Sequence, residues 1–140
     1  MEIKKIGEIV MINYYPIYKE IVTSISFKKI NTGLVLLQHI LQTSCVNKLR
    51  NTYKSQEIEE IIFYTLDSLI NQGFVSAIEM PRTDKRIYII DGLTSNGMKV
   101  LEVLTSNNID NKIMEWHKEF RISNPTPTSI KNAIVHTMFE

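Results

Sequence analysis

Apolar residues recur at helical spacing over much of the first third of the chain. In residues 3–27 the pattern is interrupted at Pro16, which predicts two short helices or one kinked helix, because an internal proline removes a backbone hydrogen bond. Residues 33–42 show a second helical pattern with a broad apolar face. Residues 43–54 are polar and show no helical period, so we expect at most a short extended stretch there.

A longer amphipathic helix is predicted over residues 55–72. Ser55 is the expected N-cap, and Gly73 is placed to end the helix in a left-handed conformation. The face expected to be buried consists of five apolar residues: Ile58, Ile62, Leu66, Leu69 and Ile70. The opposite face is expected to carry Glu57, Glu60, Tyr64, Asp67, Ser68 and Asn71. With Glu59, the helix holds four carboxylates and no Lys or Arg.

A hairpin and a capped helix are predicted after this acidic helix. Residues 74–80 and 86–90 alternate in character and are separated by a five-residue tip, which indicates two antiparallel strands. Asp91 and Gly92 are expected to end the second strand. Thr94 then caps a helix that runs to about residue 105. Three apolar residues of that helix are expected to face inward: Met98, Leu101 and Leu104.

Two further helices are predicted towards the C-terminus. The first covers residues 109–121, and the second follows a proline-containing connector, with Thr128 or Ser129 as its N-cap. In the first helix we expect these residues to be buried: Ile113, Phe120 and either Trp116 or His117. In the second we expect the buried residues to be Ile130, Ala133, Ile134 and Met138.

The composition fits one globular domain of 140 residues, because 44% of the residues are apolar and 22% are charged. No apolar run approaches the roughly 18 residues needed to cross a bilayer, so no membrane association is expected. Cys45 is the single cysteine, which excludes an internal disulfide and favours a reducing, cytoplasmic setting. The abundance of Ile, Lys and Asn is typical of a low-GC bacterium or one of its mobile elements.

Three short motifs carry a resemblance to winged-helix proteins. They are LDSLINQGFV at residues 66–75, RTDKR at residues 82–86 and GLTSNG at residues 92–97. This succession resembles winged-helix regulators of the multiple-antibiotic-resistance type, in which a recognition helix ending in glycine precedes a basic wing tip and a Leu-Thr-x-x-Gly turn. From about Gly33 to the C-terminus the chain is more similar to a family of short, uncharacterised bacterial and phage proteins, a domain of unknown function.

The resemblance implies a single α+β domain of winged helix-turn-helix type with a two-stranded wing. Residues 31–106 would form the winged-helix core. Residues 1–30 would be an N-terminal helical extension, and residues 107–140 would form C-terminal helices.

Such a fold predicts a small DNA-binding transcriptional regulator. Six basic residues are the candidate contacts to the DNA: Lys48, Arg50, Lys54, Arg82, Lys85 and Arg86. The acidic helix opposes this prediction, because its outward carboxylates would face a polyanion. A net charge of +1 also argues against strong non-specific binding to phosphates.

The alternative prediction is a protein-interaction module of a phage or mobile element that binds a host protein. Its docking face would be acidic and aromatic, formed by Glu57, Glu60, Tyr64 and Asp67. A symmetric homodimer is also expected, because the leading helices in residues 1–27 are apolar enough to pair with a second copy.

No catalytic, metal or cofactor site is expected. His39, Cys45, His117 and His136 are too scattered for metal-ligand spacing, and the sequence has no glycine-rich phosphate loop. No nucleophile, base and orienting group can be assembled, so we expect a non-enzymatic protein. Trp116 is expected to be a core residue or a helix-packing anchor at a dimer interface.

Overall fold

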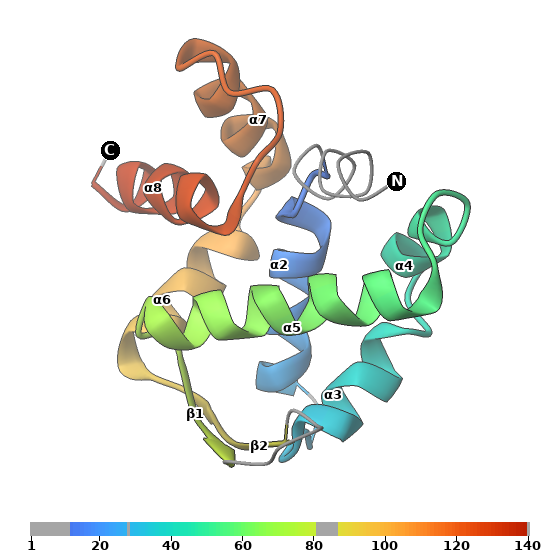
Figure 1. Ribbon diagram of the computed structural model, residues 1–140. Coiled ribbons are helices and arrows are strands. Elements are labelled where there is room, and N and C mark those ends of the chain that lie inside the picture. Colours follow the sequence, from blue (N-terminus) through green and yellow to red (C-terminus); the bar gives the residue numbers. More distant parts are fainter. Residues whose placement is uncertain (1–11, 28, 81–86, 140) are drawn as a thin grey trace.

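The computed structural model describes residues 12–27, 29–80 and 87–139. In these residues the fold is mixed α+β, with seven helices and one two-stranded antiparallel sheet. The elements follow each other in the order α2 (Tyr15–Phe27), α3 (Gly33–Ile40), α4 (Ser44–Leu49), α5 (Ser55–Asn71), β1 (Val75–Met80), β2 (Ile87–Leu93), α6 (Ser95–Leu104), α7 (Ile109–Glu119) and α8 (Pro127–Met138). Figure 1 shows α5 crossing in front of α2, with α7 and α8 on one side of the crossing and α3 and the hairpin on the other.

Helix α2 is the central helix of the fold. It contacts α3, α4, α5, α6, α8 and β2. Six of its apolar side chains are buried within the chain itself, whereas Phe27 at its C-terminal end is 70% exposed; the buried ones are Tyr15, Ile17, Tyr18, Ile21, Val22 and Ile25. These buried side chains of α2 are therefore not available to pair with a second copy, while residues 1–11 of the expected extension lie outside the described residues. Pro16 lies in the first turn of α2 and does not kink it, because a first-turn proline gives up no helical hydrogen bond.

Helix α4 overturns the expectation of an extended stretch in residues 43–54. The helix is only six residues long, and Val46 is its one fully buried side chain. A single inward residue cannot produce a helical period in the sequence, which is why the pattern did not reveal it. A helix therefore precedes α5 directly, with a short turn between them (Figure 1).

Helix α5 forms as predicted, with one change at its start. Lys54, and not Ser55, occupies the N-cap position, and the carboxylate of Glu57 accepts a hydrogen bond from the Lys54 backbone N–H at 2.8 Å. Gly73 follows the helix with φ at 81°, which confirms the left-handed end. Four of the five predicted inward residues are buried, and Ile70 is half-buried.

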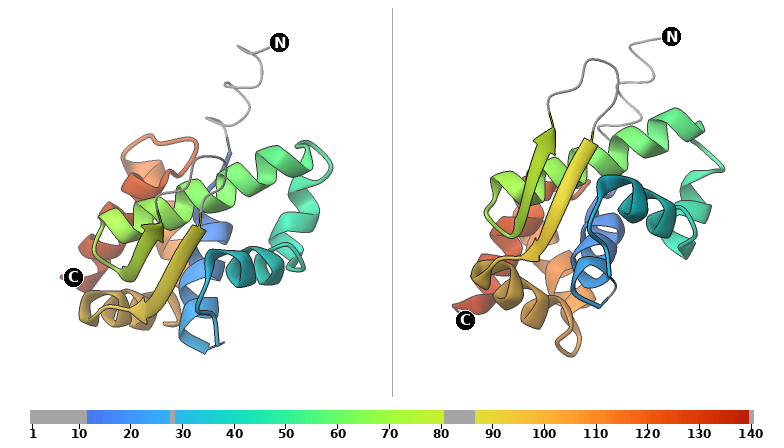
Figure 2. Two further views of the ribbon diagram at one scale, coloured as in Figure 1. Left: turned by 60° about the horizontal axis from the view of Figure 1, so that its bottom comes forward. Right: turned by 90° about the horizontal axis from the view of Figure 1, so that it is seen from below.

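The hairpin is antiparallel, and its second strand is longer than expected. Strand β2 continues to Leu93, because the pairing passes the irregularity near Gly92 through a β-bulge. Asp91 and Gly92 therefore do not end the strand. Thr32, just before α3, forms an isolated antiparallel bridge with Ile89 of β2. Figure 2 shows the hairpin lying beside α5 and α3.

A tightly packed junction joins α5, the hairpin and α6. The hydroxyl of Thr94 donates to the Gly73 carbonyl at 2.5 Å and accepts from the Gly97 N–H at 3.0 Å, which confirms Thr94 as the N-cap of α6. A Cβ added to Gly97 would lie 2.0 Å from the carbonyl oxygen of Phe74. Only glycine fits at this position, since the two backbones approach so closely.

The C-terminal helices bury some of the predicted residues and expose others. Ile113, His117, Ile130, Ala133 and Ile134 are buried, as are Leu101 and Leu104 of α6. The predicted burial of three other residues is wrong, because each is more than a third exposed: Met98, Phe120 and Met138. Thr126, and not Thr128 or Ser129, is the N-cap of α8, and its hydroxyl accepts from the Ser129 N–H at 3.1 Å.

Candidate functional site

The basic residues at the end of α4 and before α5 differ in whether their side chains are hydrogen-bonded within the fold. Lys48 and Lys54 are exposed on either side of the turn that joins the two helices. Arg50 is occupied: its guanidinium donates to the Leu41 carbonyl oxygen at 2.6 Å and to Asn47 Oδ1 at 2.5 Å. It caps the C-terminal end of α3 and holds the turn that leads into α4.

The other predicted DNA contacts lie outside the described residues: Arg82, Lys85 and Arg86. The sheet is described up to the pair formed by Met80 and Ile87, which stand next to them in the sequence. The outward face of the hairpin at this end is apolar, because Ile78 and its partner Ile89 are 62% and 47% exposed.

Glu57 is not part of an exposed acidic face. Its side chain is 7% exposed, and its carboxylate is used to cap the first turn of α5. The predicted outward position of Glu57 is therefore wrong, since a capping carboxylate folds back onto its own backbone and is lost from the surface.

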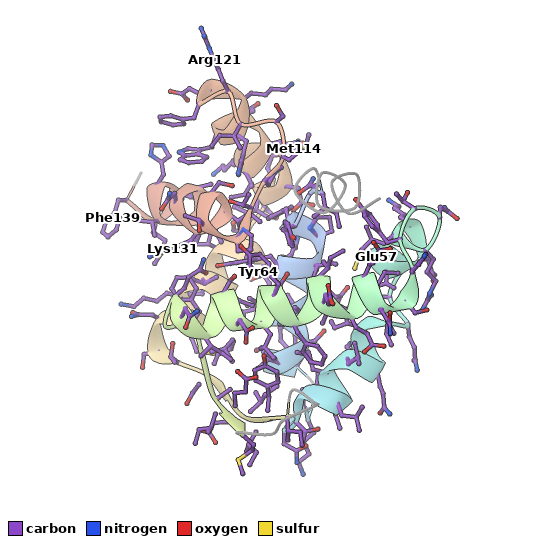
Figure 3. All side chains as sticks on the ribbon, in the orientation of Figure 1. Glu57, Tyr64, Met114, Arg121, Lys131 and Phe139 are labelled. Atoms are coloured by element: carbon purple, nitrogen blue, oxygen red, sulfur yellow. The ribbon has the colours of Figure 1, made fainter. Side chains whose placement is uncertain are left out.

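Glu60 and Tyr64 do lie on the outer side of α5. Glu60 is exposed, and Tyr64 is 51% exposed. Figure 3 labels Tyr64 on α5. The ring of Tyr64 contacts the ring of Tyr14, with centroids 5.5 Å apart. This contact links the outer side of α5 to the segment that leads into α2.

Asp67 faces the hairpin. Its carboxylate accepts a hydrogen bond from the hydroxyl of Tyr88 on β2, and Phe63 stacks on the Tyr88 ring at a centroid distance of 5.6 Å. Of the four carboxylates of α5, Glu57 and Asp67 are thus engaged within the fold, and Glu59 is half-buried. The outward negative charge is concentrated at Glu60.

A pocket of about 420 Å³, which the sequence did not predict, lies where α2, α4 and α7 converge. Its lining includes charged and thiol side chains from all three helices: Lys19, Glu20, Cys45 and Asp110. Figure 3 places Met114, another lining residue, on the side of α7 that lies towards the start of α2. These positions are far apart in the sequence and form no motif, so no local pattern could have found them.

An ion pair forms part of the pocket wall. Lys19 Nζ lies 2.9 Å from Asp110 Oδ1, and the hydroxyl of Tyr15 donates to the same oxygen at 2.6 Å. These two donors, Tyr15 first and then Lys19, hold the pKa of the Asp110 carboxyl below its ordinary value. Burial, together with the bond to Asp110, raises the pKa of the Tyr15 hydroxyl. Burial also raises the pKa of the Cys45 thiol, which therefore stays protonated near neutral pH.

The histidines are spread over the fold. His117 is buried, with Nδ1 at 2.7 Å from the Ile113 carbonyl oxygen and Nε2 at 2.8 Å from the Ser129 hydroxyl, so it joins α7 to the start of α8. Among the described residues, no three His, Cys, Asp or Glu side chains lie close enough together to hold a metal ion.

Comparison of the chain with protein-family models, curated proteins and solved structures gives no match. No helix in the described part of the chain has the length and apolar character that a membrane span requires. The functional conclusion therefore depends on the geometry of this chain alone.

Proposed function

We propose that the chain is a small, non-enzymatic winged-helix DNA-binding regulator of bacterial or phage origin. The observation that carries this proposal is the order α3, α4, α5, β1 and β2, in which α4 supplies a helix directly before α5. In a helix-turn-helix the first helix crosses the DNA backbone and the second enters the major groove. Helices α4 and α5 are the counterparts of these two helices, and the hairpin is the wing.

The attachment of the hairpin supports this assignment. The Ile90 N–H donates to the Asn31 carbonyl oxygen at 2.9 Å, next to the bridge between Thr32 and Ile89. The segment before α3 is therefore bonded to the free edge of β2 by a single bridge. Through this bridge and the Asp67–Tyr88 contact, the hairpin is tied to both α3 and α5, and a defined orientation of the hairpin relative to α5 is what joint binding to one duplex requires.

The proposed contacts are mainly to DNA phosphates. Lys48 and Lys54 are exposed beside the start of α5, where a recognition helix approaches the backbone. The wing would add three more cations: Arg82, Lys85 and Arg86. Glu60 is the one exposed carboxylate of α5, and a glutamate can accept a hydrogen bond from the amino group of a cytosine. Arg50 has a structural role in this proposal.

The test is a titration of a mixed-sequence DNA duplex across salt concentrations with the R82A/K85A/R86A variant. If the wing binds phosphates, the slope of log affinity against log salt becomes shallower by about 0.9 for each phosphate that the variant no longer neutralises. The variant K112A/K118A/K131A removes the same charge from α7 and α8 and should leave the slope close to that of the native chain; Figure 3 labels Lys131 on α8. No binding at low salt, or equal slopes for the two variants, would overturn the proposal.

The regulator would act as a symmetric homodimer through α7 and α8. Phe120 and Phe139 are 57% and 83% exposed, and Figure 3 shows Phe139 at the outer end of α8, pointing away from the body of the molecule. F139D should shift the chain from dimer to monomer in analytical ultracentrifugation. L34D, at an apolar side chain that is 62% exposed on α3, should not. A native chain that is monomeric at all concentrations contradicts the dimer.

A protein-interaction module is the second candidate, favoured by the exposed Glu60 and Tyr64 on a helix without any cation. A basic host protein would dock there, with Tyr64 as its aromatic anchor. The E60Q/Y64A variant should then lose a partner that co-purifies with the native chain, whereas E115Q should retain it. Retention by both variants would reject this candidate.

A further inference from the structure

The pocket between α2, α4 and α7 has the size and lining of a small-molecule site. Its volume of about 420 Å³ lies within the range of about 300–1,000 Å³ that is typical of ligand pockets. Part of the lining is apolar, with Ile113, Met114 and Pro125, and another part consists of charged and hydroxyl side chains of α2 and α4. A ligand that fits must therefore combine an apolar body with a polar end.

The charges in the pocket indicate the sign of that polar end. Asp110 is already matched by Lys19 and by the Tyr15 hydroxyl. Glu20 is half-buried beside them, and its carboxylate accepts from the neutral hydroxyl of Ser24 at 3.3 Å. It forms no ion pair with any residue that the structure describes. Among the described lining residues, Lys19, Glu20 and Asp110 together carry a formal charge of −1, and Glu20 is the carboxylate without a cationic partner there.

We propose that this pocket binds a small organic cation, a protonated amine or quaternary ammonium with an apolar body. The cation would pair with Glu20, and the body would lie against Ile113 and Met114. Ser44 and Thr23 supply hydroxyl acceptors for the remaining N–H groups of an amine. Because it rests on the pocket alone, this assignment stands whether or not the chain binds DNA.

Cys45 provides a reporter inside the pocket. It is a lining residue and the only cysteine of the chain, so thiol modification reports on this one position. Its side chain is half-buried, and a ligand in the pocket would cover it. The rate of alkylation by iodoacetamide should therefore fall as the pocket fills.

The experiment compares three indole compounds of similar size by isothermal titration calorimetry with the full chain. Tryptamine carries a cation, tryptophol a neutral hydroxyl group and indole-3-acetate an anion. Tryptamine should bind most tightly and indole-3-acetate most weakly, and tryptamine should slow the alkylation of Cys45. E20Q should weaken tryptamine by about fivefold and leave tryptophol unchanged, since only the charge pairing is removed.

The matched control is E115Q, which removes the same charge from an exposed position of α7 outside the pocket lining. It should leave all three affinities unchanged. The proposal is overturned if indole-3-acetate binds as tightly as tryptamine, or if E20Q and E115Q have equal effects. It is also overturned if tryptamine neither binds saturably up to millimolar concentration nor protects Cys45. A circular-dichroism melt of E20Q checks that the variant is folded.

Discussion

Two regions of the molecule differ in how their polar groups are paired. One is the junction formed by Gly73, Thr94 and Gly97, and the other is the pocket that contains Glu20 and Asp110. In the junction, the Thr94 hydroxyl is bonded to the Gly73 carbonyl oxygen and to the Gly97 N–H, so it is fully used by the fold. In the pocket, polar side chains from three distant segments meet, and one carboxylate remains without a cation among the described residues. Polar groups that are fully hydrogen-bonded stabilise the fold, whereas a charged side chain without a partner of opposite charge remains available to bind a ligand.

The largest effect is expected in the junction. G97A would place a methyl group against the Phe74 carbonyl oxygen and should lower the free energy of unfolding by about 3 kcal/mol, because backbone atoms cannot move aside as a side chain does. Chemical denaturation measures this change. N96A, at an exposed position in the same turn, should stay within about 0.5 kcal/mol of the native chain. Similar losses for both variants would show that the junction is not tightly packed.

A smaller effect is expected at the first turn of α5, where a carboxylate is again hydrogen-bonded to backbone within the fold. E57A should cost about 1 kcal/mol of stability, because the Lys54 N–H loses the carboxylate that accepts its hydrogen bond. E60A removes the same side chain from an exposed position and should change stability little. Thermal unfolding of the pair decides whether Glu57 is a capping residue. An equal loss in both variants would contradict that role.

At the pocket wall, the contribution of Asp110 should depend on pH. Its lowered pKa means that the folded chain keeps the carboxylate ionised where the unfolded chain begins to take up a proton. The stabilisation is complete above the ordinary value of 3.8 and is lost as the pH falls towards the lowered value. D110N should therefore cost about 0.5 kcal/mol at neutral pH, since the pair is exposed, and almost nothing at strongly acidic pH. Denaturation at several pH values tests this, and a constant difference would refute it.

The smallest effect is expected at Glu20. E20Q should change the free energy of unfolding by less than about 0.5 kcal/mol in the absence of any ligand, because no ion pair within the described residues is broken. Denaturant unfolding of E20Q and E57A in parallel compares a carboxylate without an ion-pair partner with one that caps a helix. If E20Q lowered the free energy of unfolding as much as E57A does, Glu20 would also have a structural role, and the contrast between the pocket and the hydrogen-bonded regions would fail.

The elements with local signals could be predicted from the sequence. Gly73 and Thr94 end and begin helices through their own backbone and side-chain chemistry, and both lie at the expected places. The sequence does not predict helix α4, because only Val46 of its six residues is fully buried. Its stability comes from contacts with the rest of the fold, which no local pattern records.

The functional surfaces were harder to predict, for a related reason. Glu57 and Glu60 are three residues apart on one helix and look alike in the sequence, yet one is a cap and the other is exposed. Which of them faces solvent depends on the path of the chain before α5. Lys19 and Asp110 meet across 91 residues, so their pairing follows from the tertiary fold alone.

Gln72 links three parts of the chain that are far apart in the sequence. Its amide oxygen accepts from the Tyr18 hydroxyl at 2.7 Å, and its amide nitrogen donates to the Pro127 carbonyl oxygen at 3.0 Å. During synthesis on a ribosome, this relay can close only after the start of α8 has emerged. Until then the end of α5 lacks the hydrogen bond from Gln72 to Pro127. In that state the nascent chain exposes apolar helix faces, to which chaperones bind and at which proteases can cleave.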